Sequence, residues 1–300
     1  MYHSTEYHRE FWDVVRGKQR SGRYIESGRN VDNGSYRLPY ESNEQFASVL
    51  KKENLFRQIA TVVTAAHGDH TIWAHNDEPA VAWLNPQNNN GFHKNIPAFD
   101  RIRVTGHKLG SMIQVSEDLC NDAEFDLEGH VTKMFARSVG HAEEAALING
   151  DGVDAPSGFL NDATIGHSTG EVTYDDVIRL YFSLDKEYRR NAVWIMNDET
   201  ALKLRTLKDA SGNYLWNHAD NTIMGKPVHI SNYMPDMAAG DKPIAFGDFS
   251  YLWIIDRIPF GMRRLNERFA VQQQVGFIGY EYIDAKLIRP DAVHVMQITE

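Results

Sequence analysis

The chain has 300 residues, of which 42% are hydrophobic and 24% are charged, and its formal net charge is −10. This length suffices for one large domain or two ordinary ones with a sizeable core. The acidic balance argues against a general nucleic-acid-binding protein, because such proteins gain affinity by neutralising phosphates. No apolar run approaches the ~20 residues that span a bilayer, and the N-terminus has no apolar signal segment, so we expect a cytoplasmic protein without a membrane partner. The single cysteine, Cys120, excludes an intramolecular disulfide and is expected to be a small buried hydrophobe.

The first 37 residues differ in composition from the rest, because they carry seven Lys and Arg against five Asp and Glu. Residues 6–16 have the spacing of a short helix with Phe11 and Trp12 on its apolar side. A polar run rich in Gly, Ser and Asn follows. Since so short a helix is marginal in water, its aromatic side chains need a surface to pack on. We predict an N-terminal arm, residues 1–37, that carries an aromatic anchor; a disordered tag without a role is the alternative.

The folded body is expected to begin near Pro39 with a helix capped by Ser42, followed by a strand at 60–65. Residues 71–103 then contain two strand-like arms joined through three Asn and a Gly. With about sixteen residues per arm at ~3.3 Å each, this hairpin would reach roughly 50 Å. The radius of gyration for this chain length is only about 19 Å. An extended hairpin would therefore leave the body and suit a contact with another subunit, whereas a loop folded back on its own domain is the alternative.

Residues 125–149 form the longest helical pattern of the chain. Apolar residues recur at spacings of three to four, and acidic residues lie near the start, where the helix dipole favours anions. The pattern stops at Gly150, which suits a left-handed cap. In this register Ala142 faces inward, whereas Glu143 and Glu144 lie on other faces. We expect an amphipathic helix roughly 37 Å long.

A second α+β unit is predicted from residue 173 onward. It begins with a helix capped by Thr173 and continues with a helix capped by Asn197 or Asp198. Short strands are expected at 192–196, 226–231, 243–248 and 251–256, two long strands around a turn near 272–275, and a final strand at 292–299. A long polar loop near 208–225 is expected to expose its aromatic side chains. The fold class is therefore α+β.

The best candidate for enzyme chemistry is a histidine-rich stretch that contains His67, Asp69, His70 and His75. Residues 67, 70 and 75 do not all share one face of a strand, and the sequence has no HExxH, GxSxG, P-loop or GxGxxG motif. Glu143 and Glu144 would point about 100° apart on a helix, which makes them poor partners in acid and base catalysis. We therefore expect no enzyme, no metal and no cofactor, and retain a metal-dependent hydrolase as a remote alternative.

Several long motifs resemble those of the major capsid protein of tailed bacteriophages of the Hong Kong 97 type. In chain order they are EEAALINGDG, PSGFLN, LDKEYRRNAVWIMNDETALKLRTLKDASGNYLW, MGKPVHISNYMPD and PIAFGDFSYLWIIDR. The resemblance runs over most of residues 36–300. It implies the Johnson fold, with an N-arm, an extended two-stranded E-loop, a peripheral domain built on a long spine helix, and an axial domain.

Carried onto this chain, the resemblance implies these boundaries: N-arm 1–37, E-loop 71–103, peripheral domain 38–70, 104–169 and 256–283 with the spine helix at 125–149, and axial domain 170–255 and 284–300. It also implies a virion shell of hexamers and pentamers that encloses double-stranded DNA without sequence-specific binding. Assembly in the host bacterial cytoplasm, with a portal and a scaffold or protease as partners, is expected. The chain begins directly at the arm, so we expect a matured or truncated form, or a family member with a separate scaffold. An encapsulin-type compartment with the same fold is the alternative.

The residues expected to make contacts between subunits lie in the arm, the E-loop, the polar loop and the hairpin of residues 263–283. They are Phe11, Trp12, Trp73, Trp83, Phe92, Lys94, Arg101, Arg103, Tyr214, Leu215, Trp216, Arg263 and Arg264. Some members of the family form Lys to Asn crosslinks between subunits. Lys94 is the sole lysine of the E-loop segment and Asn266 lies near the hairpin, but no motif specifies this pairing, so crosslinking stays open.

Overall fold

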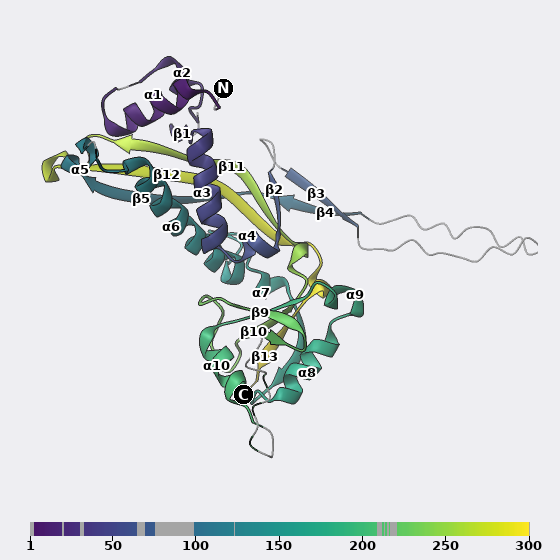
Figure 1. Cartoon of the computed structure of the whole chain (residues 1–300). Helices are drawn as coiled ribbons and strands as arrows, with labels where there is room; N and C mark the ends of the chain where they lie inside the picture. Colours follow the sequence, from purple (N-terminus) through teal and green to yellow (C-terminus); the bar gives the residue numbers. More distant parts are fainter. Residues whose placement is uncertain are drawn as a thin grey trace, which may run out of the picture. The chain divides into compact units, whose positions relative to one another are not determined.

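The computed structural model describes residues 3–19, 21–30, 33–64, 70–75, 99–122, 124–208, 212, 214, 216 and 221–299 (Figure 1). The chain divides into two compact units, of which the smaller is residues 66–105. In this unit β3 (His70–His75) pairs with β4 (Phe99–Val104) in an antiparallel ribbon. The register runs from His70 opposite Val104 to His75 opposite Phe99. This pairing agrees with the predicted hairpin, whose connecting residues 76–98 lie outside the described part of the chain.

A five-stranded sheet forms one half of the larger unit. Its strands are β1 (Tyr36–Arg37), β11 (Leu252–Leu265), β12 (Gln274–Leu287) and β5 (His107–Ser116), in that order, and β2 (Thr61–Thr64) also pairs with β11. The predicted short strand at 251–256 is the beginning of β11. The hairpin that β11 forms with β12 is therefore longer than predicted. Both long strands run through the expected domain boundaries at 255/256 and 283/284.

Two helices accompany this sheet: α6 (Leu127–Asn149) packs beside β5 and against α3 (Tyr40–Glu53). The helix predicted over 125–149 is confirmed, and its first turn is capped by Asp126, whose Oδ1 accepts a hydrogen bond from Gly129 N (3.0 Å). Its end differs from expectation, because Gly150 has φ −59° and is not left-handed. A side chain at Gly150 would overlap the carbonyl oxygens of Ala146 and Pro156, so close approach explains the glycine.

The first helix after the arm also begins earlier than predicted. The residue before α3 is Pro39, and Ser42 lies inside the helix, buried, rather than at its cap. The Ser42 hydroxyl accepts a hydrogen bond from Trp12 Nε1 (3.2 Å) and donates one to Glu128 (2.8 Å). After α3 the chain turns into the short helix α4 (Phe56–Ile59) instead of continuing as one helix.

A six-stranded mixed sheet forms the other half of the larger unit. Its order is β6 (Thr164–Thr169), β13 (Val293–Ile298), β10 (Ile244–Gly247), β7 (Val193–Met196), β9 (Lys226–Ile230) and β8 (Thr222–Ile223). Strand pairs β6–β13 and β7–β9 are parallel, and the others are antiparallel. Sequence reasoning missed β6, because TIGHST contains a single large apolar residue.

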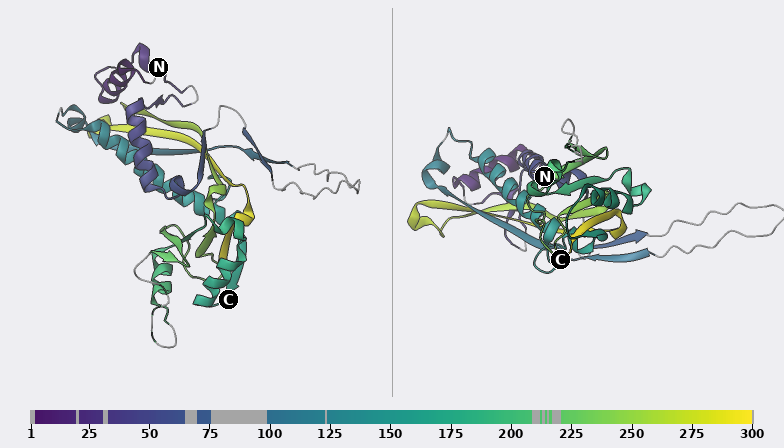
Figure 2. Two further views of the ribbon diagram at one scale, coloured as in Figure 1. Left: turned by 45° about the vertical axis from the view of Figure 1, so that its right-hand side comes forward. Right: turned by 90° about the horizontal axis from the view of Figure 1, so that it is seen from below.

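Helices α8 (Tyr174–Ser183) and α10 (Asp198–Thr206) lie on opposite sides of strands β9, β10 and β13 in Figure 1 and in the left view of Figure 2. As predicted, Thr173 caps α8, and the reciprocal hydrogen bonds of a capping box join it to Asp176. Asn197 caps α10 through Thr200 N (2.8 Å). The remaining described helices are α1 (Thr5–Arg16), α2 (Arg23–Glu26), α5 (Glu117–Asn121), α7 (Phe159–Asp162), α9 (Lys186–Arg189) and the 3₁₀ turns η1 (Phe249–Tyr251), η2 (Ala270–Gln272) and η3 (Pro290–Ala292).

The larger unit contains three hydrophobic clusters. The first lies between the five-stranded sheet and helices α1, α3 and α6, the second around the C-terminal end of α6, and the third within the six-stranded sheet and its helices. Cys120 belongs to the first cluster and is 2% exposed, as predicted, and burial raises the pKa of its thiol. Within the described residues, none of the helices combines the length and apolar character that crossing a membrane requires.

Candidate assembly surfaces

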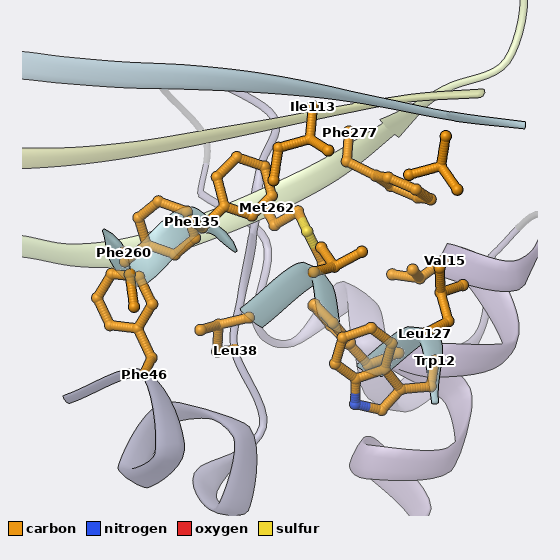
Figure 3. Packing of buried hydrophobic residues seen from close by; sticks show 14 of the residues in the cluster. Trp12, Val15, Leu38, Phe46, Ile113, Leu127, Phe135, Phe260, Met262 and Phe277 are labelled. Carbon is orange, nitrogen blue, oxygen red and sulfur yellow. The ribbon is translucent and has the colours of Figure 1, made fainter. Parts of the chain in front are cut away.

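The aromatic residues of the N-terminal segment are buried in the chain's own core. Phe11 is 0% and Trp12 5% exposed, and both belong to the first hydrophobic cluster. Figure 3 shows Trp12 in this cluster together with Leu127 of α6. The backbone carbonyl of Val15 accepts a hydrogen bond from Arg264 Nη1 of β11 (2.9 Å). The core of the same chain therefore provides the apolar surface that α1 needs, and a contact of Phe11 and Trp12 with another subunit remains a prediction.

The predicted exposed aromatic loop is only partly exposed. Trp216 is 4% exposed and belongs to the third hydrophobic cluster, with the Arg205 guanidinium 4.6 Å from its ring centroid. Its predicted exposure is wrong, because the tryptophan packs on its own domain. Tyr214 is 50% exposed, with Lys208 Nζ 4.8 Å from its ring centroid, and its contact with another subunit remains a prediction. Leu215 lies outside the described residues.

For the ribbon residues 70–75 and 99–103 the structure describes only the backbone. Trp73 of β3 lies opposite Arg101 of β4 in the register, and Thr71 lies opposite Arg103. The other three predicted ribbon contacts, Trp83, Phe92 and Lys94, lie outside the described residues. Their role in contacts between subunits remains a prediction.

The hairpin formed by β11 and β12 presents one fully exposed apolar side chain at its largely polar tip, and the sequence analysis did not predict it. Val271 of η2 is 100% exposed, and Gln273 turns the chain with φ 54°. The two predicted arginines, Arg263 and Arg264, are half-buried. Arg264 Nε donates to Asn266 (2.7 Å), and the same guanidinium binds α1, so this side chain serves the subunit's own structure.

Helix α10 and strand β9 form a shallow groove of about 400 Å³, lined by Asp198, Glu199, Ala201, Leu202, Arg205 and Ile230. We call it the α10 groove. Leu202 is 64% and Ile230 39% exposed, so two large apolar side chains flank acidic residues. The helical spacing of α10 turns Leu204 inward, and this leaves Leu202 outward.

Helix α8 presents a different surface, which we call the α8 face. Phe182 at its C-terminal end is 60% exposed, and the Arg189 guanidinium lies 5.3 Å from its ring centroid. Lys186 and Arg190 nearby are exposed. α8 packs on β6 and β13, at the edge of the six-stranded sheet remote from β8 and β9. The two surfaces are therefore unlike each other and lie toward opposite edges of one sheet.

The candidate metal ligands of the histidine-rich stretch lie outside what the structure describes. Of its candidate ligands, His67 and Asp69 lie outside the described residues, and the side chains of His70 and His75 are not described. Elsewhere in the described chain, no group of three or more His, Cys, Asp and Glu is arranged to hold a metal ion.

Glu143 and Glu144 do not lie on solvent-facing sides of α6, and that prediction is wrong. They are 2% and 7% exposed, whereas Ala142, predicted to face inward, is exposed. Glu144 accepts hydrogen bonds from Leu55 N (2.8 Å) and Ser231 Oγ (2.5 Å). Partners from distant parts of the chain therefore compensate the burial of these carboxylates, which a helical pattern alone cannot reveal.

Comparisons with known proteins agree with the motifs. The model of the phage capsid family matches residues 34–298. The structure resembles the capsid of a native GTA particle (31% identity, TM-score 0.68, 85% of this chain and 91% of the other). It also resembles the capsid of an empty GTA particle (30% identity, TM-score 0.71, 83% and 90%). A chain from Microbacterium phage Oxtober96 shares the fold at 15% identity (TM-score 0.63, 82% and 91%). The search of curated proteins finds no match.

The family model spans the strands of both sheets and the long helix α6, so the match concerns most of the fold rather than one motif. They do not favour an encapsulin, and they identify a structural protein rather than an enzyme. The chain belongs to the phage capsid family and is a shell protein of the Hong Kong 97 fold.

Proposed function

We propose that this chain assembles into hexamers and pentamers that close into an icosahedral shell around double-stranded DNA. The observation that carries the proposal is the family match over residues 34–298, together with 31% identity to a capsid chain computed with C5 symmetry. The net charge of −10 is compatible with this role, because a container must confine DNA without binding it along its length.

The two unlike surfaces of the six-stranded sheet support a ring. A head-to-tail contact uses a different surface on each partner and closes into a ring when its rotation allows. The α10 groove offers Leu202 and Ile230 beside Asp198 and Glu199, while the α8 face offers Phe182 near basic side chains. We assign the contact around each hexamer and pentamer to these two surfaces.

The partners and setting of assembly are part of the same proposal. The resemblance of the chain to tailed-phage capsid proteins supports a portal, a scaffold or protease, and assembly in the cytoplasm of a bacterial host. Peripheral and axial domains with the boundaries given above are also proposed. Strands β11 and β12 cross two of these boundaries and so connect the two domains. The ribbon of β3 and β4 is proposed to contact a neighbouring subunit.

The substitution Leu202→Glu tests the ring contact. It places a charge in the α10 groove without touching the core, so we expect folded subunits that fail to form closed particles in electron micrographs. Thr206→Glu is the matched control, because it adds the same charge to an exposed position of the same helix. Closed particles from Leu202→Glu in normal yield would refute the assigned surface. Failure of the unmodified chain to form closed, DNA-containing particles with its assembly partners would refute the proposed function itself.

A further inference from the structure

Four charged or acidic side chains meet inside the larger unit at the boundary between two hydrophobic clusters. They are Arg57 of α4, Glu143 of α6, Asp256 of β11 and Glu281 of β12, and we call them the polar seam. On α6, β11 and β12, the buried residues on one side of the seam belong to the first hydrophobic cluster and those on the other side to the second. The residues of the first cluster are Val139, Phe260 and Phe277, and those of the second are Leu147, Ile254 and Ile283.

Arg57 is the cation that binds two of the seam's carboxyl groups. Its Nε donates to Glu143 Oε2 (2.7 Å), and its Nη1 and Nη2 donate to Asp256 (3.0 and 2.9 Å). Asn54 Nδ2 donates to the same oxygen of Glu143 (2.9 Å). The side chain of Glu143 is 0% exposed and that of Arg57 is 10% exposed, so their contact is shielded from water, whereas the Asp256 side chain is 29% exposed.

Glu281 is the third carboxyl group of the seam. The Arg57 guanidinium acts on it through its charge, while its hydrogen bonds go to Glu143 and Asp256. It is 5% exposed, and within the described residues its Oε1 has no hydrogen-bond partner. Burial, the neighbouring charge of Glu143 and a hydrogen bond with Glu143 raise the pKa of Glu281 well above its usual value. A protonated carboxyl group can donate that hydrogen bond, whereas two ionised carboxylates would repel each other.

The other charged groups around the seam come from β5, β12 and α6. In β5 the residue opposite Glu281 is Leu109, and His107 lies 3.6 Å from Asp284 of β12. Lys108 lies over the Tyr280 ring, 4.1 Å from its centroid. Glu144 binds Ser231 and Leu55 rather than the seam. None of these contacts supplies a cation hydrogen-bonded to Glu281 in the described chain.

We propose that the polar seam is a proton-dependent joint within the subunit. Glu281 keeps a proton shared with Glu143 at pH values where an exposed glutamate has lost it, and loss of this proton at higher pH loosens α6 from β12 between the two hydrophobic clusters. The irregular register of β11 adjoins the seam, between Asp256 and Gly261, and contains Pro259, which lacks the N–H of a regular strand. The joint is a property of the folded subunit and does not depend on shell assembly.

The proton has a defined effect on folding. Because the folded state holds a proton that the unfolded chain releases near the usual Glu pKa of ~4.3, folding takes up a proton above that pH. The equilibrium constant for unfolding should then rise up to about tenfold per pH unit, until the pH passes the pKa of Glu281 in the folded state. Stability from this group is thus full at low pH and is lost as pH rises.

Glu281→Gln tests the joint, because glutamine can donate the same hydrogen bond but cannot ionise. We expect its melting temperature to exceed that of the unmodified chain by a margin that grows with pH from 5 to 9. We also expect loss of one protonated-carboxyl band in the infrared spectrum at pH 7. Glu267→Gln, at an exposed position of the hairpin turn, should change neither measurement. Parallel melting profiles, or an unchanged infrared band, would overturn the proposal.

Hydrogen exchange locates the effect. At pH 9, amides of residues 279–283 and 139–144 should exchange faster in the unmodified chain than in Glu281→Gln. Amides of α10 should exchange equally fast in both. An equal increase in exchange over the whole chain would overturn the proposal. If Glu281→Gln fails to fold, Glu143→Gln replaces it. That variant removes the negative charge that keeps Glu281 protonated, so Glu281 should ionise beside Arg57 and the infrared band should disappear. Persistence of the band would overturn the proposal.

Discussion

Arg57 and Glu143 lie 86 residues apart in the sequence, yet the Arg57 Nε donates to Glu143 Oε2 at 2.7 Å in a buried site. The contact ties the short helix α4 to the middle of α6. Arg57 also binds Asp256 of β11, so one guanidinium joins three elements of the larger unit. Burial of charge at this point is tolerated because the partners compensate each other.

We predict that Arg57→Ala destabilises the subunit by about 3–5 kcal/mol, because it leaves buried carboxylates without their cation. The stability of Arg57→Lys should lie between that of the unmodified chain and that of Arg57→Ala, since lysine keeps the positive charge but cannot reproduce the paired guanidinium hydrogen bonds. Urea unfolding measures both. Arg137→Ala, which breaks an ion pair with Glu53 from a side chain that is 69% exposed, is the control and should cost less than ~1 kcal/mol. Equal losses for Arg57→Ala and Arg137→Ala would show that the seam is not coupled as described.

The cap of α8 should respond to acid. Burial acts to raise the pKa of Asp176, but hydrogen bonds from Thr173 and His167 outweigh it, and the pKa is lowered. The stabilisation is therefore present above the usual Asp pKa of ~3.9 and is lost as pH falls through the lower pKa of the folded state. We predict that Thr173→Ala costs about 1 kcal/mol at pH 7 and less at pH 3. Melting temperatures at the two pH values check this, and a loss that is the same at both would contradict the assignment.

The packing of α1 on its own subunit can be tested by truncating its aromatic face. Phe11→Ala should cost about 3–5 kcal/mol, as expected for a fully buried phenylalanine. Phe182→Ala, at a position 60% exposed, should cost about 1 kcal/mol or less. The loss should not depend on protein concentration in unassembled subunits. A loss that appears only at concentrations where subunits associate would show that α1 packs on a neighbour instead.

The ribbon offers a clean deletion. His75 and Phe99 are opposite each other at the end of the described register, so residues 76–98 can be replaced by an Asn-Gly turn that closes the hairpin. We predict a folded subunit with an unchanged melting temperature that fails to form closed shells. Electron microscopy and sedimentation distinguish the outcomes. Normal shells from this variant would rule out a role of the ribbon in contacts between subunits.

Much of the fold was predictable where local chemistry decides it. The periodicity of apolar residues predicts the helix at 127–149, and a side-chain oxygen at a helix start predicts the caps Thr173 and Asn197. The alternation of residues predicts the pairing of β3 with β4. The family resemblance was readable in the same way, because its motifs are contiguous. The candidate surfaces for contacts between subunits were less predictable. The sequence around Trp12 and Trp216 does not distinguish a tryptophan in the core from one that contacts another subunit.

The sequence by itself determined the α+β class, the main helices and strands, and membership of a capsid family, since each depends on residues close together in the chain or in contiguous motifs. Only the tertiary structure decided which polar residues are buried. Glu143 is on the inner face of α6 because Arg57 and Asn54 reach it from 86 and 89 residues away. No local pattern encodes such partners. Likewise, β6 exists because β13 pairs with it from the far end of the chain, and the exposure of Leu202 and Phe182 follows from which sides of their helices the sheet covers.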